Sequence, residues 1–142
     1  MKKGALIDPT GLYRYSLWRE WDANAPKITF IMLNPSRADA TVDDPTIRRC
    51  INFASSWSYG FLEVVNLFAY RTSDPKKLHL VEDPVGQDND RYIQRAVSEA
   101  KVVVLAWGHN DSIFYREALY TDKLFAKGYN NSIFYKVALH SS

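Results

Sequence analysis

The sequence has little cysteine and no long apolar run. Cys50 is the single cysteine in 142 residues, so no disulfide can form within the chain and no set of cysteine ligands can hold a metal. No run of apolar residues approaches the ~18 that a membrane span requires, and none follows the first residues as in a secretory signal. We therefore expect a cytoplasmic protein in which Cys50 is a buried thiol.

The common catalytic signatures are also missing. The sequence contains no Gly-rich phosphate loop and no His-Glu-x-x-His, Cys-x-x-Cys or Gly-x-Ser-x-Gly motif. These absences exclude the nucleotide triphosphatases, metalloproteases and serine hydrolases that carry such motifs. The three histidines His79, His109 and His140 are scattered, and a metal site would need carboxylates beside them. We expect neither a metal nor a cofactor.

Positive and negative residues are nearly balanced, with 18 Lys and Arg against 16 Asp and Glu. The formal net charge is +2, which is too small to indicate binding to nucleic acid or membrane without a clustered patch. The sequence is instead rich in apolar residues, with 46% hydrophobic and 14% aromatic residues. This composition is sufficient for one globular domain over residues 1–142 with a well-formed core.

Apolar runs and helical patterns alternate along the chain. Strands are predicted at residues 13–21, 28–33, 61–67 and 101–107. One helix should begin with Asp44 as N-cap and Pro45 in its first turn, and another should begin near Asp88. This order predicts an α/β fold: a three-layer α/β/α sandwich with a short, mostly parallel sheet of about four strands and an N-terminal edge strand at 13–21.

Each predicted helix has an apolar stripe that should face the sheet. The first stripe comprises Ile47, Cys50, Ile51, Ala54 and Trp57. The second comprises Ile93, Ala96, Val97 and Ala100.

Residues with side chains suited to ligand binding follow the predicted parallel strands. Asn34 and Ser36 leave the strand at 28–33, Asn66 lies near the end of the next, and Trp107 and His109 stand at the end of the third. The carboxyl edge of an open α/β sheet is where ligands bind. Two amides there could read a planar polar ligand, or each could hold its own loop. His109 could be an acid, a base, an anion contact or an ordinary loop histidine.

Three arginines lie close to these strand ends. Arg48 and Arg49 stand in the first turns of the helix that begins at Asp44, and Arg71 is in the next loop. Guanidinium groups at a helix N-terminus can hold a phosphate. However, Asp44 would itself occupy that positive end, and the arginines could pair with nearby aspartates. The second interpretation is somewhat favoured, and both remain open.

Five sequence blocks occur in order: Leu33-Asn34-Pro35-Ser36, Asp44-Pro45-Thr46-Ile47-Arg48-Arg49, Asn66-Leu67-Phe68-Ala69, Asp83-Pro84-Val85-Gly86 and Ala106-Trp107-Gly108. Together they resemble the bacterial and phage domain of unknown function family 1643 over residues 13–109. This resemblance implies a relative without implying an activity. Residues 110–142 would then form a divergent or truncated C-terminal segment, in which 130–139 repeats seven of the ten residues of 110–119.

A second, weaker likeness is to the uracil-DNA glycosylase superfamily, whose members are α/β/α sandwiches with a four-stranded parallel sheet. Asn34 is similar to the residue of that family that positions the attacking water, and Asn66 to the asparagine that binds the flipped base. The likeness implies an N-glycosylase with Asn34 as its catalytic residue. Arg48, Arg49 or Arg71 would contact phosphate.

The C-terminal segment departs from the glycosylase pattern. Such enzymes carry a late loop with His-Pro, whereas residues 110–142 contain no proline. If that loop stabilises charge in the transition state, this chain lacks it. Two functions stay open: an α/β domain that binds a nucleobase, nucleotide or DNA at the strand edge, as an N-glycosylase relative, or a non-catalytic interaction module whose aromatic surface is covered by a partner.

Overall fold

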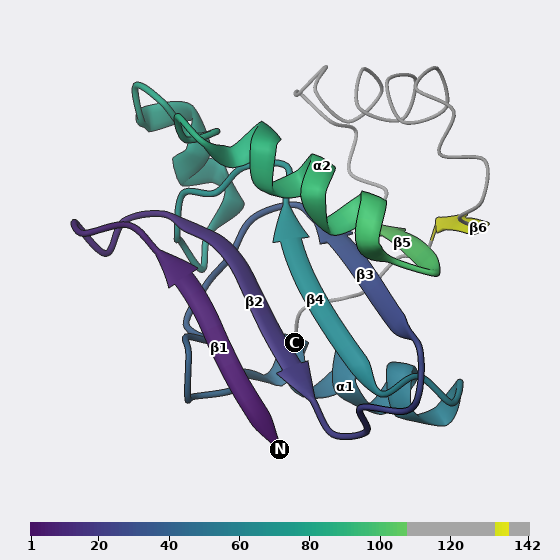
Figure 1. Ribbon diagram of the computed structural model, residues 1–142. Helices are drawn as coiled ribbons and strands as arrows, with labels where there is room; N and C mark the ends of the chain where they lie inside the picture. The colour runs from purple at the N-terminus through teal and green to yellow at the C-terminus, as the bar shows by residue number, and fades with distance from the viewer. Residues whose placement is uncertain (108–132, 137–142) are drawn as a thin grey trace.

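The computed structural model describes residues 1–107 and 133–136 (Figure 1). Within these residues the strands are β1 (Lys2–Ile7), β2 (Arg14–Glu20), β3 (Lys27–Met32), β4 (Phe61–Asn66), β5 (Val102–Ala106) and β6 (Ile133–Lys136). The helices are α1 (Pro45–Ser56), the 3-10 helix η1 (Pro75–Leu80) and α2 (Asn89–Glu99). All of the strands belong to one sheet in the order β1-β2-β4-β3-β5-β6.

The sheet is mixed, which confirms the α/β class. Strands β4, β3, β5 and β6 run parallel to one another, whereas β2 pairs with β4 in antiparallel fashion and β1 pairs with β2 in the same way. The strand predicted at 13–21 exists as β2, but its predicted position at the edge is wrong. The outer strand is β1, which pairs with β2 from Lys2 to Ile7. Its short sequence gives no clear alternation, and its backbone pairing with β2 defines it.

The two α-helices pack on opposite faces of the sheet, with α2 in front and α1 on the far side in Figure 1. On the α1 face the core contains Ile28, Phe30, Leu62, Val64, Val102 and Val104 from the strands and Ile47, Cys50 and Ala54 from the helix. On the α2 face it contains Ile31, Val65, Val103 and Leu105 from the strands and Ile93, Ala96 and Val97 from the helix. Because the strands are buried on both faces, their sequences are almost continuously apolar.

Helix α1 begins as predicted. Asp44 is its N-cap, the Asp44 side chain accepts a hydrogen bond from Ile47 N, and Pro45 occupies the first helical position. The prediction that Trp57 is buried is wrong. Trp57 lies at the C-cap, where it is 46% exposed and stacks on Phe53. The helix ends at Ser56, so Trp57 is not part of the periodic face that packs on the sheet.

Helix α2 also follows its predicted stripe, burying Ile93, Ala96 and Val97. Its N-cap is Asp88, although the Asp88 side chain makes no capping hydrogen bond. Ala100 follows the last turn and is only partly buried. No helix in the described part of the chain is long and apolar enough to cross a bilayer.

The path of the chain places β3 between two parallel neighbours, β4 and β5. After β3 it passes through α1 on one face to reach β4, and after β4 it passes through α2 on the other face to reach β5. Strands β4 and β5 therefore flank β3 on its two sides. Strands β3 and β4 are parallel neighbours, so their carboxyl ends lie at the same edge of the sheet, the edge at which open α/β sheets bind ligands.

Candidate functional site

A β-bulge in β2 brings Arg14 to the α1 face of the sheet. Residues 6 and 7 of β1 pair with Ser16 and Arg14, so Tyr15 has no partner on β1. An extra residue of this kind interrupts the alternation of side chains. Tyr15 stacks on Tyr92 of α2, with 5.3 Å between the ring centroids. Arg14 extends to the other side, toward the end of β4.

Arg14 is a buried cation beside the carboxyl end of β4, with 2% of its surface exposed. Its Nη1 donates to the carbonyl of Ala38 at 3.1 Å and its Nη2 donates to Asn66 Oδ1 at 3.4 Å. Its Nε is buried and has no hydrogen-bond acceptor within 1–107 and 133–136. Burial lowers the pKa of the guanidinium to about 10, against the opposing effect of the Asp44 carboxylate, so Arg14 stays charged at neutral pH.

Asn66 is the last residue of β4 and is 1% exposed. It lies on the same side of the strand as Val64, which belongs to the α1-face core. Because a guanidinium can only donate, the contact with Arg14 fixes the orientation of the amide, with Oδ1 facing Arg14. The opposite atom, Asn66 Nδ2, is a buried donor without an acceptor in the described structure. Such a donor costs about 1–3 kcal/mol, which an acceptor atom on a ligand would recover.

Asn34 behaves differently from Asn66. Its Nδ2 donates to the carbonyl of Thr72 at 2.7 Å and to that of Pro35 at 3.1 Å. The backbone N–H of Thr72 also donates to the Pro35 carbonyl, at 2.9 Å. The amide group therefore joins the loop after β3 to the loop after β4. No hydrogen bond from a described residue reaches Asn34 Oδ1, which leaves that oxygen as an acceptor at this edge.

Arg71 holds the loop that follows β3. Its three guanidinium nitrogens donate to the carbonyls of Ser36 at 3.2 Å, Gly11 at 3.2 Å and Arg37 at 3.3 Å. All three acceptors are backbone atoms, so the contacts fix the path of the chain around Ser36. Arg71 is only partly buried, and its contacts leave Ser36 half-buried at the strand exit.

The N-terminus of α1 is occupied by Asp44. Oδ1 of Asp44 accepts from Ile47 N at 2.9 Å, and Oδ2 accepts from Ala38 N at 3.2 Å. The carboxylate thus takes the place that a phosphate would need at this helix end.

The two arginines of α1 differ in exposure. Arg48 is exposed and donates to the carbonyl of Asp43 at 3.3 Å. Arg49 is partly buried beside Cys50. Burial raises the pKa of the Cys50 thiol to about 12, and the charge of Arg49 acts in the opposite direction.

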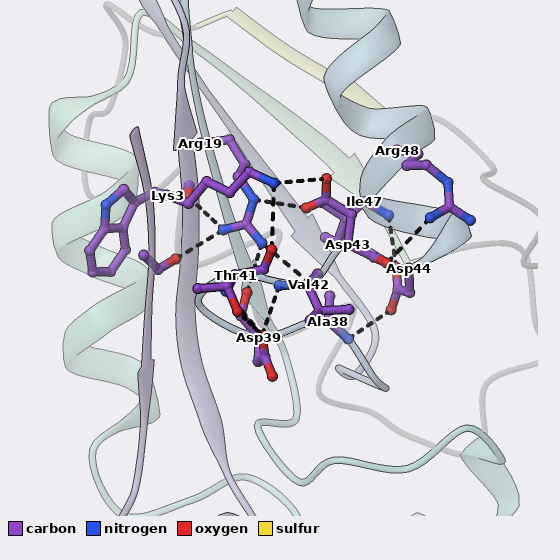
Figure 2. A network of polar contacts seen from close by, with 12 residues as sticks. Lys3, Arg19, Ala38, Asp39, Thr41, Val42, Asp43, Asp44, Ile47 and Arg48 are labelled. Carbon is purple, nitrogen blue, oxygen red and sulfur yellow. Dashed lines mark hydrogen bonds and ion pairs between the residues drawn. The ribbon is translucent and has the colours of Figure 1, made fainter. Parts of the chain in front are cut away.

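A second buried arginine, Arg19, holds the loop between β3 and α1 (Figure 2). Its Nε donates to Asp43 Oδ1 at 2.8 Å, and its Nη2 donates to the carbonyl of Asp39 at 2.7 Å. Its Nη1 donates to the carbonyl of Gly4 in β1 at 3.3 Å. Arg19 therefore fixes residues 38–44, the loop that supplies both the N-cap of α1 and the carbonyl bound by Arg14.

The remaining predicted residues lie near the end of β5. Trp107 is 5% exposed and packs in the core on the α2 face. His109 lies outside the described residues. In the described part of the chain no group of three or more His, Cys, Asp or Glu side chains could hold a metal ion.

The sequence interpretation did not identify Arg14 or Arg19. Both lie in a strand that was expected at the edge, where arginines normally face water. Their burial depends on β1 covering β2 and on the loop at 38–44 covering both side chains. The available signal was the group of aspartates at Asp39, Asp43 and Asp44, which could have indicated buried cationic partners elsewhere.

Comparison with known proteins identifies a family. The family model described as "Protein of unknown function (DUF1643)" matches residues 14–134. The match continues past residue 109, where the resemblance was expected to end. Neither the curated proteins nor the solved structures gave a match to the chain. The likeness to uracil-DNA glycosylases finds no support in these comparisons.

Proposed function

The chain belongs to the DUF1643 family of proteins of unknown function, and from its site we propose that the carboxyl edge between β3 and β4 binds a nucleobase or nucleotide. The observation that carries this proposal is the buried amide of Asn66. Arg14 fixes its orientation, and Nδ2 faces no acceptor in the described structure. A carbonyl or phosphate oxygen of the ligand would accept from Nδ2.

The rigid loops around the edge support binding without large rearrangement. Asn34 joins the two loops that leave β3 and β4, and Arg71 fixes the chain at Ser36. A ligand that enters between these loops meets donors that are already positioned, so less conformational entropy is lost on binding.

Hydrolysis of an N-glycosidic bond is the catalytic form of this proposal. Asn34 Oδ1 would accept a hydrogen bond from a water and orient it toward the sugar carbon, and Asn66 would bind the base. The fixed Nδ2 of Asn34 supports this role, because it holds the side chain in one orientation. The exposed guanidinium of Arg48 could then contact a phosphate. A three-layer α/β/α arrangement, supported by one core on each face of the sheet, belongs to the same proposal.

A non-catalytic interaction module is the second candidate. It is favoured by the loop contacts of Arg71, whose nitrogens are engaged by backbone carbonyls. It is also favoured by Phe53 and Trp57, which stack at 5.4 Å on the exposed side of α1. A partner protein would cover this aromatic pair.

Calorimetric titration with a panel of nucleobases, nucleosides and nucleotides tests the binding proposal. Asn66→Asp removes the Nδ2 donor, keeps the side-chain size and retains an acceptor for Arg14. We expect this variant to bind the ligand at least about 10-fold more weakly, since a hydrogen bond to a buried group is lost. Asn52→Asp, an exposed change on α1 with the same chemistry, is the control and should bind normally. Failure of every compound to bind the wild-type protein would refute the proposal.

The catalytic form has its own test. Labelled oligonucleotides that contain a deaminated or otherwise modified base are incubated with the protein, and base loss is scored by strand cleavage at the abasic site. Activity that disappears in Asn34→Ala would support hydrolysis. Binding without base excision would instead support the non-catalytic interpretation of the same site.

A further inference from the structure

Arg14 carries a charge that no acidic side chain in the described structure neutralises through a direct contact. Its two hydrogen-bond acceptors there are neutral, the carbonyl of Ala38 and the amide oxygen of Asn66. Asp44 is the acid whose charge favours the guanidinium most, but both of its oxygens accept from backbone N–H groups. The positive charges of Arg71 and Arg19 act against that of Arg14.

A buried charge is costly unless it is paired and fully hydrogen-bonded. Arg19 shows the usual solution in this protein, because its Nε meets the carboxylate of Asp43 at 2.8 Å. The Nε of Arg14, by contrast, has no hydrogen-bond acceptor in the described structure. Arg14 therefore retains the capacity to bind a negatively charged group.

The unused donors of Arg14 and Asn66 belong to side chains that touch each other. Arg14 Nε is bonded to the same guanidinium carbon as Nη2, and Asn66 Nδ2 is bonded to the same amide carbon as Oδ1, the two atoms that are in contact. One donor comes from a cation and the other from an amide of fixed orientation. Their chemistry matches a single group with several anionic oxygens, which can accept from both side chains and supply the missing charge.

We propose that Arg14 and Asn66 bind a phosphate group at the carboxyl edge of β4, so that the ligand of this site is a nucleotide in preference to a free base or nucleoside. This inference rests on the proposed binding site and specifies its ligand: Asn66 Nδ2 donates to the phosphate, and this assignment replaces the base-binding role that Asn66 has in the glycosylase form. The Asp44 carboxylate excludes phosphate from the N-terminus of α1, and the phosphate is instead bound by the two side chains at the strand ends.

Two measurements test this inference on the full chain. Thermal unfolding is followed with inorganic phosphate and with potassium chloride at matched ionic strength, and with acetate as a carboxylate probe. Calorimetry then compares each nucleoside with its monophosphate. We expect phosphate to raise the melting temperature more than chloride or acetate does, and a monophosphate to bind at least about 10-fold more tightly than its nucleoside.

Substitutions at Arg14 locate the effect. Arg14→Met removes the charge at similar length and should abolish both the phosphate-induced shift and the preference for the monophosphate. Arg14→Lys keeps the charge and should retain part of both. Arg91→Met removes an arginine on the exposed side of α2, and both effects should persist in it. Asn66→Asp supplies an internal counter-ion and should fold normally while losing the phosphate response, which keeps the test valid if Arg14→Met does not fold.

The outcomes separate the two proposals. Equal binding of nucleoside and monophosphate, with no shift from inorganic phosphate, would overturn the phosphate inference and leave nucleobase binding intact. A phosphate shift that survives Arg14→Met or Asn66→Asp would also overturn it. An acetate shift as large as the phosphate shift would replace phosphate by a carboxylate ligand. No binding of any compound would overturn both proposals.

Discussion

At the scale of the single residue, Cys50 offers a direct test of the α1-face core. It is fully buried, and its Sγ lies 3.9 Å from Met32 Sδ. Burial keeps reagents away from the thiol and raises its pKa to about 12, so the thiol also stays protonated at neutral pH. We expect Cys50 to be inert to an aromatic disulfide reagent at about pH 8 in the folded protein and to react fully in denaturant. Rapid stoichiometric labelling of the native protein, followed by absorbance, would contradict this packing.

Gly86 gives a second test at this scale. Its φ is +92°, and a Cβ on it would lie 2.9 Å from Tyr15 Cε1 and 3.1 Å from Tyr13 Cδ1. Gly86→Ala should therefore lower the free energy of unfolding by about 1–3 kcal/mol, as measured by urea denaturation. Gly11 has a φ of +76° and open space around its Cα, so Gly11→Ala should cost less. Equal losses for the two variants would show that the tyrosines do not confine Gly86.

Only those residues of the candidate site whose own side-chain chemistry stands out from their neighbours in the sequence could be predicted. Asn34 and Asn66 were identified because an amide at the end of an apolar run needs partners. The sequence did not reveal which amide would be tied to a loop, because the acceptor of Asn34 lies at Thr72, in a distant loop. Arg14 was not identified because the side of the sheet that it faces depends on the bulge at Tyr15. A strict alternation of side chains along the strand does not predict such a bulge.

At the scale of the element, the N-terminus of α1 depends on Asp44. Its carboxylate satisfies Ile47 N in the helix and Ala38 N in the preceding loop. Asp44→Ala should lower the free energy of unfolding by about 1–2 kcal/mol, since the capping bond is lost and a buried N–H is left without its acceptor. Asp74→Ala removes the exposed cap of η1 and should cost less. Unfolding in urea, followed by circular dichroism, measures both, and a larger loss for Asp74→Ala would contradict this role of Asp44.

The helices and strands that could be predicted are those for which the signal lies in their own residues. The strands β3, β4 and β5 and the start of α1 follow from buried apolar runs and from the Asp-Pro signal. The edge strand β1 could not be predicted, because its stability comes from pairing with β2. At Gly4 the indole of Trp18 lies so close that a Cβ would be 2.1 Å from Cζ2. The requirement for glycine at position 4 is therefore clear only when β1 is paired with β2.

At the scale of the whole molecule, the sheet should be most stable at its centre. Strand β3 pairs with β4 and β5 and is covered on both faces, whereas β1 pairs with β2 alone. We expect amide hydrogens of β3 and β4 to exchange slowest with deuterium and those of β1 to exchange faster. Hydrogen exchange followed by mass spectrometry tests this gradient. Protection of β1 equal to that of β3 would mean that the edge opens only when the whole sheet unfolds.

The bulge at Tyr15 has an evolutionary consequence. The neighbours of Arg14 depend on the number of residues between Arg14 and the regular part of β2, and not only on which residues these are. A relative that lacks one residue between Arg14 and Leu17 would keep its arginine in the alignment and yet turn it toward the tyrosines on the α2 side. A single gap in that stretch should therefore divide relatives whose arginine faces the end of β4 from those whose arginine faces α2, where comparison of residue identities alone would group them together.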